Sequence, residues 1–132
     1  MIKFTIPLPP VSKKNSQQIF INRRTGKPFI TPSEAYKRYA DTVAAFYIPP
    51  GGCVDYPVNV KCVFYMPTRR KCDLTNLLEA IDDIMVKAGL LADDNYNIIA
   101  SHDGSRVMYD KARPRTEIEI TEAEQWQQQN CT

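Results

Sequence analysis

Acidic side chains are concentrated in one stretch of the chain, at spacings that can bring several carboxylates to one groove. Asp73 opens the stretch, Glu79 and Asp83 follow it, and the pair Asp93-Asp94 comes ten residues after Asp83. Carboxylates that converge repel one another unless a cation lies among them, and Mg²⁺ prefers oxygen ligands. A metal ion held in this way polarises a phosphoryl oxygen and lowers the pKa of an attacking water. The stretch therefore predicts a metal-dependent site suited to phosphodiester hydrolysis.

The first of these acids lie in a segment whose apolar periodicity predicts a helix from Asp73 to Ala88, with Gly89 just beyond its end. On a helical wheel at about 100° per residue, Asp73, Asn76 and Asp83 fall along one edge of the apolar stripe. A residue at such an edge faces a groove rather than open solvent. The stripe itself is formed by Leu74, Leu77, Leu78, Ile81, Ile84, Met85 and Ala88.

The same wheel places three further polar residues of this helix. Thr75 and Asp82 fall on the outer face and are interpreted as ordinary surface residues. Glu79 lies beyond the groove edge, but its longer side chain can reach back toward the other acids. His102 is the single histidine of the chain and is interpreted as a loop residue without a site of its own.

Each part of the acidic pattern also has a purely structural explanation. Asp73 alone could be a helix N-cap, and Asp93-Asp94 alone could be a polar turn. Their combination with two basic loops, Lys13-Lys14-Asn15 and Arg69-Arg70-Lys71, is less common. Such cations neutralise the phosphates of nucleic acids, and Tyr96, inside the acidic turn, is the aromatic residue that is a candidate for a DNA contact.

Charge is distributed unevenly along the chain. Residues 1–72 contain twelve Lys or Arg against three Asp or Glu, whereas residues 73–132 contain five against twelve. A basic half and an acidic half in one domain suggest a phosphate-binding surface beside a metal-binding one. The alternative is that the charges mix once the chain is folded, and then the asymmetry has no functional meaning.

The remaining periodicity predicts a small single α+β domain in which a mixed β-sheet packs against two main helices. Thr31-Pro32-Ser33-Glu34 is a typical helix start with Thr31 as N-cap, so the first helix is expected to run to about Tyr47. Residues 1–120 are expected to form the domain, and residues 121–132 a polar C-terminal tail. Strands are predicted over residues 2–6, 58–64, 98–100 and 116–120, with a hairpin over residues 19–30.

Length and composition argue against several other classes of protein. A chain of 132 residues fits one domain, and no apolar run approaches the roughly 20 residues that span a bilayer. Residues 1–6 alternate like a strand and lack the apolar core of a signal peptide, so a cytoplasmic location is expected, with no membrane partner and no nucleotide cofactor. Four cysteines without a C-x-x-C pair argue against a zinc site, and their thiols are expected to be reduced.

The segment from Asp73 to Ile84, followed by Leu91-Ala92-Asp93-Asp94-Asn95, resembles the RusA family of Holliday-junction resolvases. The opening Ile6-Pro7-Leu8-Pro9-Pro10 and the strand near residues 116–120 resemble that family as well. The likeness spans residues 2–120 and is most specific in the helix and the Asp-Asp turn. It implies a small domain that dimerises, binds four-way DNA junctions in recombination and repair, and makes paired nicks with Mg²⁺, or alternatively Mn²⁺. Many members are carried by phages or prophages.

The pattern and the resemblance together predict the site. Asp73, Glu79 and Asp94 are the predicted catalytic residues, and these three with Asp83 and Asp93 are the predicted metal ligands. Asn76 matches a helix asparagine of the family and is predicted to support the site. The predicted DNA contacts are Lys13, Lys14, Asn15, Arg69, Arg70 and Lys71.

Two positions depart from the family pattern. Thr75 stands where the family has a second aspartate, and Glu79 stands where it has a catalytic lysine. A carboxylate one helical turn after Thr75 could restore the number of ligands, and Lys71 or Lys13 could supply positive charge to the transition state. Three hypotheses stay open: a homodimeric nuclease that resolves four-way junctions, a junction-binding protein with little or no cleavage, and a nuclease for flaps or forks.

Overall fold

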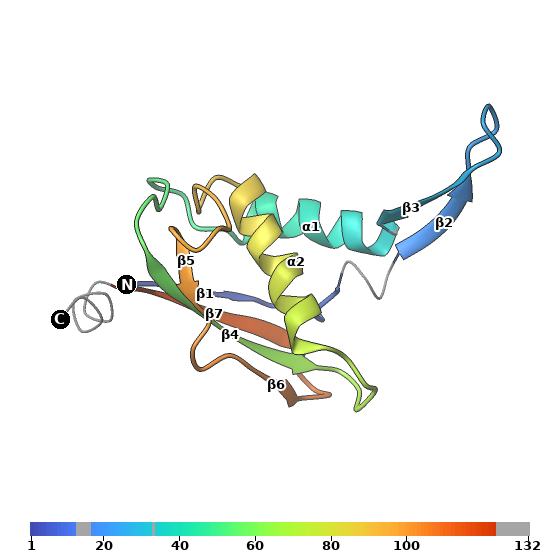
Figure 1. Ribbon diagram of the computed structural model, residues 1–132. Coiled ribbons are helices and arrows are strands. Elements are labelled where there is room, and N and C mark those ends of the chain that lie inside the picture. Colours follow the sequence, from blue (N-terminus) through green and yellow to red (C-terminus); the bar gives the residue numbers. More distant parts are fainter. Residues whose placement is uncertain (13–16, 33, 124–132) are drawn as a thin grey trace.

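In the part of the chain that the structure describes, five strands form one mixed sheet and two helices cover one of its faces (Figure 1). The computed structural model describes residues 1–12, 17–32 and 34–123, and within these it describes only the backbone of residues 17–20 and 29–32. The elements are β1 (Ile2–Ile6), β2 (Gln17–Ile21), β3 (Pro28–Pro32), α1 (Glu34–Phe46), β4 (Val58–Met66), α2 (Leu74–Lys87), β5 (Ile99–Ser101), β6 (Arg106–Tyr109) and β7 (Arg115–Glu122). The predicted α+β class is confirmed.

The central strand of the sheet is β4. It pairs antiparallel with β7, which in turn pairs antiparallel with β1. Along its other edge, β4 pairs in parallel with β5 near its first residues and with β6 near its last. Ile118 and Ile120 of β7 are buried, while Glu117 and Glu119 between them are partly exposed, so one face of the sheet belongs to the core and the other is polar.

The core lies between the sheet and the helices. Leu77, Ile81 and Met85 of α2 are buried in one cluster with Phe64 of β4 and Val43 of α1. The apolar stripe predicted for this helix is thereby confirmed in its central residues. The helix also ends as predicted, because Gly89 follows it with a φ of 84°, a left-handed conformation that glycine adopts without strain.

The hairpin predicted over residues 19–30 is confirmed, but the start of the first helix is not. β2 and β3 form a separate two-stranded sheet that projects away from the body of the molecule (Figure 1). Thr31 and Pro32 belong to β3, and α1 begins only at Glu34, so the predicted N-cap at Thr31 is wrong. The residue before a proline is disfavoured in helical conformation, which explains why Thr31 is extended.

The carboxyl-terminal part contains more strand than the sequence predicts. β6 was not predicted, because its four residues are mostly exposed and follow no alternating pattern. β7 continues through Thr121 and Glu122, which pair with Asn59 and Val58. The predicted boundary of the polar tail at residue 121 therefore falls inside a strand.

Cys53, Cys62 and Cys72 are free thiols, and burial raises the pKa of the Cys62 thiol well above its usual range, which makes that thiol unreactive. Within residues 1–12, 17–32 and 34–123, no helix has the length and apolar character needed to cross a membrane.

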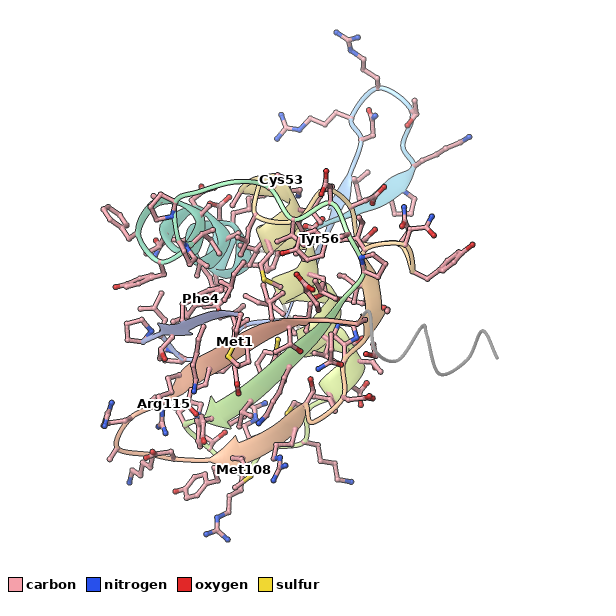
Figure 2. All side chains as sticks on the ribbon, turned by 90° about the vertical axis from the view of Figure 1, so that its left-hand side faces the viewer. Met1, Phe4, Cys53, Tyr56, Met108 and Arg115 are labelled. Carbon is pink, nitrogen blue, oxygen red and sulfur yellow. The ribbon has the colours of Figure 1, made fainter. Side chains whose placement is uncertain are left out.

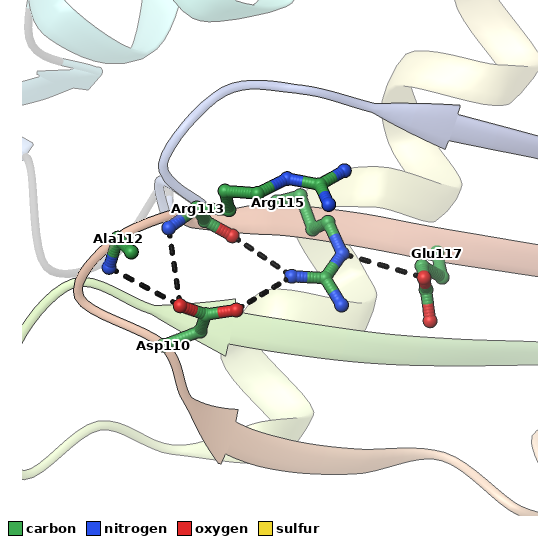
Figure 3. A network of polar contacts seen from close by, with 5 residues as sticks. All are labelled: Asp110, Ala112, Arg113, Arg115 and Glu117. Carbon is green, nitrogen blue, oxygen red and sulfur yellow. Dashed lines mark hydrogen bonds and ion pairs between the residues drawn. The ribbon is translucent and has the colours of Figure 1, made fainter.

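Arg115 stabilises the loop between β6 and β7 through several contacts (Figure 3). Its Nη1 donates hydrogen bonds of 2.9 Å to Asp110 Oδ2 and to the Arg113 carbonyl oxygen, and its Nε donates to Glu117 Oε2 at 3.3 Å. The guanidinium also lies 3.7 Å from the centre of the Tyr65 ring. These contacts fix the loop that joins two strands of the sheet.

Replacing Asp110 by Asn should lower the melting temperature at neutral pH but not in acid. Hydrogen bonds from the Arg113 backbone and the Arg115 side chain hold the pKa of Asp110 below its usual range. The folded-state pKa is lower than the unfolded one, so this stabilisation is present above about pH 4 and disappears as the pH falls through the folded pKa. Thermal unfolding of both proteins across this range measures the effect, and a difference that persists in acid would contradict it.

Candidate active site

Three carboxylates share one electrostatic environment where α2 passes the turn that follows it. Burial is the main factor that raises the pKa of Asp82, and the negative charges of Asp94 and Glu79 raise it further. Glu79 and Asp82 are three residues apart and therefore neighbours on the helix surface. Charges influence one another strongly only within roughly 10 Å, so the acidic turn brings Asp94 close to Asp82.

Asp82 is not the surface residue that the helical wheel predicts. It is only 7% exposed, and its Oδ2 lies 2.8 Å from Nε2 of His102, which follows β5. Its Oδ1 is buried and has no hydrogen-bond partner among the described residues. The wheel assumes that only one side of the helix is covered, whereas α2 is also covered where the segment after β5 returns to it. His102 is a loop residue, as predicted, but it has a specific partner.

The two aspartates of the turn have different surroundings. Both oxygens of Asp93 are used within the turn, where Oδ1 accepts from the Asp94 backbone N–H at 2.7 Å and Oδ2 accepts from Asn95 Nδ2 at 3.1 Å. The Asp94 side chain is exposed and makes no hydrogen bond or ion pair with the residues that the structure describes. Asp93 therefore shapes the turn, and Asp94 presents its carboxylate to solvent or to a ligand.

Asp73 occupies the N-cap position of α2 but does not cap the helix with its side chain. Its Oδ2 instead accepts a hydrogen bond from Asn76 Nδ2 at 3.2 Å. Asp73 precedes Glu79 by six residues, or roughly 9 Å along the helix axis. Thr75, which is exposed as predicted, lies between Asp73 and Glu79 on this helix.

Asp83 is turned toward α1 rather than toward the acidic turn. Its Oδ2 accepts a hydrogen bond from the Tyr36 hydroxyl at 3.4 Å and lies 3.1 Å from Lys87 Nζ. The bond from Tyr36 connects the two helices. We therefore leave Asp83 out of the ligand set proposed below.

A groove of about 520 Å³ lies beside the first turn of α2. Ser12, Arg70, Lys71 and Cys72 are among its lining residues, so the basic loop before Asp73 forms one wall. Lys13, Lys14 and Asn15 come directly after Ser12 in the sequence but lie outside the described residues.

Arg69, the basic residue of this loop that does not line the groove, contacts β6. The Arg69 guanidinium lies 4.6 Å from the centre of the Tyr109 ring, and Tyr109 is 45% exposed. Met108 and Arg115 lie at this end of the molecule, away from the helices (Figure 2). A cation and an exposed aromatic ring side by side are suited to nucleic acid, and Tyr109 was not among the predicted contacts. Tyr96, the candidate aromatic contact, is 81% exposed.

Comparison with known proteins places these features in one family. The sequence profile described as Endodeoxyribonuclease RusA matches residues 7–121. This chain belongs to the RusA family. Crossover junction endodeoxyribonuclease RusA from Aquifex aeolicus (strain VF5) is similar to it, with 40% identity over 45 residues. The aligned segment covers 34% of this chain and 36% of that protein, so the likeness to this relative spans about a third of its length.

The residues of this RusA-family chain fit a divalent metal ion if substrate completes the site. Among the described residues, no three His, Cys, Asp or Glu side chains are grouped closely enough to hold a metal ion by themselves. Mg²⁺, however, is commonly held by one or two carboxylates together with waters and substrate phosphates. Asp94 and Glu79 both carry negative charge near the buried Asp82 and are the candidates for such a pair, and Asp82 Oδ1 can accept a hydrogen bond from a coordinated water.

Replacing Arg69, Arg70 and Lys71 by Ala should weaken DNA binding and flatten its dependence on salt. Each basic side chain that binds a phosphate releases condensed counterions, so the slope of log K against log salt should fall by about one for each such side chain removed. The Lys13→Ala, Lys14→Ala protein should behave in the same way. Titration of labelled DNA at several salt concentrations measures both effects, and unchanged slopes in both variants would remove these loops from the interface.

Proposed function

We propose that this RusA-family protein is an endodeoxyribonuclease that cuts branched DNA in the presence of Mg²⁺, with Mn²⁺ as the alternative ion. The observation that carries the proposal is the common neighbourhood of Glu79, Asp82 and Asp94 beside α2. The description of the family as an endodeoxyribonuclease and the name of the Aquifex relative as a crossover junction enzyme give the substrate class. Resolution of recombination and repair intermediates in the cytoplasm is the proposed setting.

Each residue of the proposed site has a distinct task. Asp94 and Glu79 hold the metal ion, which when bound neutralises charge on the phosphate and lowers the pKa of water. Asp93 keeps the turn in shape, and so keeps Asp94 in place. Asp73, supported by Asn76, approaches the substrate from the first turn of α2, next to the basic groove. Arg70 and Lys71 hold the DNA backbone along this groove.

A homodimer suits this function. A twofold axis relates two identical sites, and a four-way junction offers two symmetric strands to them. Paired nicks then follow from one bound dimer. Light scattering of the purified protein tests this part of the proposal, since a monomer at cleavage concentrations would contradict it.

The second candidate is a protein that binds junctions and cuts them poorly or not at all. It is favoured by Thr75 and Glu79, the two departures from the family pattern, and by the lack of a three-residue ligand group in the described residues. Binding without cleavage under any divalent metal ion would select this candidate.

A panel of labelled substrates tests the proposed function. Four-way junction, flap, fork and linear duplex of equal length are incubated with the protein in Mg²⁺ or EDTA. Cleavage of the four-way junction in Mg²⁺ alone, with the linear duplex intact, is the expected result. Preferential cutting of flaps or forks would show that another branched DNA is the substrate. Cutting of all four substrates would show that the protein does not select branched DNA.

A further inference from the structure

His102, the partner of Asp82, has no task in the mechanism described so far. Asp82 belongs to the middle of α2, and His102 follows β5, twenty residues later in the chain. Their side chains are 10% and 29% exposed, and the distance between Asp82 Oδ2 and His102 Nε2 is 2.8 Å. A buried carboxylate and an imidazole thus meet next to the two residues proposed to hold the metal ion.

Negative charge surrounds this pair. Glu79, Asp82 and Asp94 all contribute negative charge, and the hydrogen bond and charge of His102 counteract the effect of burial on the pKa of Asp82. The nearest lysine on the same helix, Lys87, is already paired with Asp83, and Lys61 of β4 is paired with Glu119. His102 is the basic side chain that contacts the buried Asp82 of this cluster.

Asp82 gives a second reason to expect a ligand here. Its Oδ1 is buried without a hydrogen-bond partner among the described residues. Native proteins usually satisfy a buried acceptor of this kind with water or another donor, because leaving it unpaired is destabilising. If the Asp82–His102 pair only stabilised the fold, apolar side chains of similar volume would stabilise it equally well.

We propose that His102, oriented by Asp82, is a phosphate-binding residue of the active site. This inference rests on the proposed function and extends it to a residue pair that the sequence did not single out. When both ring nitrogens carry hydrogen, Nε2–H donates to Asp82 Oδ2 and Nδ1–H is a second donor for a phosphate oxygen of the DNA. Asp82 acts through His102 and is a positioning residue, in the way that a buried carboxylate orients an imidazole in hydrolases.

Replacement of His102 by Gln separates this role from a structural one. The Gln amide nitrogen can still donate to Asp82, but the charge and the second donor are absent. We expect cleavage of the four-way junction to fall by about 10- to 100-fold and the slope of log K against log salt, measured in EDTA, to fall by about one. The melting temperature should stay within a few degrees of wild type. Asp82→Asn should show a smaller loss of the same kind.

Lys87→Gln is the matched control, because it breaks another ion pair of α2 on the side that faces α1. It should leave both cleavage and salt slope unchanged. Cleavage and salt slope of His102→Gln equal to wild type would overturn the inference, and so would a loss that merely follows a lowered melting temperature. If the wild type binds junctions but does not cut them, the proposed nuclease function fails, while the salt slope still tests His102 by itself.

Discussion

Replacing Asp94 by Asn should lower the rate of four-way junction cleavage by about 100-fold or more, without weakening junction binding. The Asp94 carboxylate is exposed and makes no hydrogen bond or ion pair with a described residue, so its charge is available to a metal ion. Asn has the same shape, and the turn is held by Asp93 and Asn95, so the fold should not change. Cleavage under single-turnover conditions, together with binding measured in Ca²⁺, separates the two effects.

The neighbouring Asp93 provides the contrast for this prediction. In Asp93→Asn the side-chain oxygen can still accept from the Asp94 backbone N–H, while the bond from Asn95 Nδ2 is lost, so the turn is partly preserved and the loss of cleavage should be smaller. A larger loss from Asp93→Asn than from Asp94→Asn would reverse the roles that we assign to the two residues.

Replacing Glu79 by Gln should abolish cleavage while leaving junction binding intact or tighter. Gln keeps the size and hydrogen bonding of the side chain but lacks the charge that a hard cation requires. Removing a negative charge near DNA phosphates also relieves repulsion, which explains why binding should not suffer. Gel-shift titration and cleavage of the same labelled junction measure both quantities.

Thr75→Asp in the Glu79→Gln protein tests whether the two positions serve one metal ion. Thr75 lies one helical turn before Glu79, so a carboxylate there should restore part of the cleavage. Wild-type cleavage by Glu79→Gln itself would show that Glu79 is an ordinary solvent-exposed helix residue.

Local features of the sequence were sufficient to predict much of the fold. The apolar periodicity of the sequence predicts α2 and its buried stripe. The end of the helix follows from Gly89, since glycine adopts a positive φ without strain. The hairpin follows from two apolar runs around a glycine-containing turn. The helix start predicted at Thr31 failed because two local rules compete there, and the preference of a residue before proline for extended backbone prevailed.

The candidate site was predicted only in its outline. The sequence indicated the acids of α2 and of the turn after it, but a helical wheel contains no information about what covers the other faces of the helix. Asp82 was therefore assigned to the surface, although the segment after β5 buries it against His102. Asp83 was assigned to the groove, although Tyr36 and Lys87 hold it. The partners of Asp82 and Asp83 across the fold depend on tertiary packing, which no local pattern records.

The most direct test of the proposed activity is incubation of the purified protein with a four-way junction labelled in turn on each strand, in Mg²⁺, Mn²⁺, Ca²⁺ or EDTA. Our account predicts nicks on two opposite strands in Mg²⁺ and Mn²⁺, and an intact but bound junction in EDTA. Binding without any cleavage in Mg²⁺ or Mn²⁺, or equal cleavage in EDTA, would contradict a metal-dependent nuclease site built on Glu79 and Asp94.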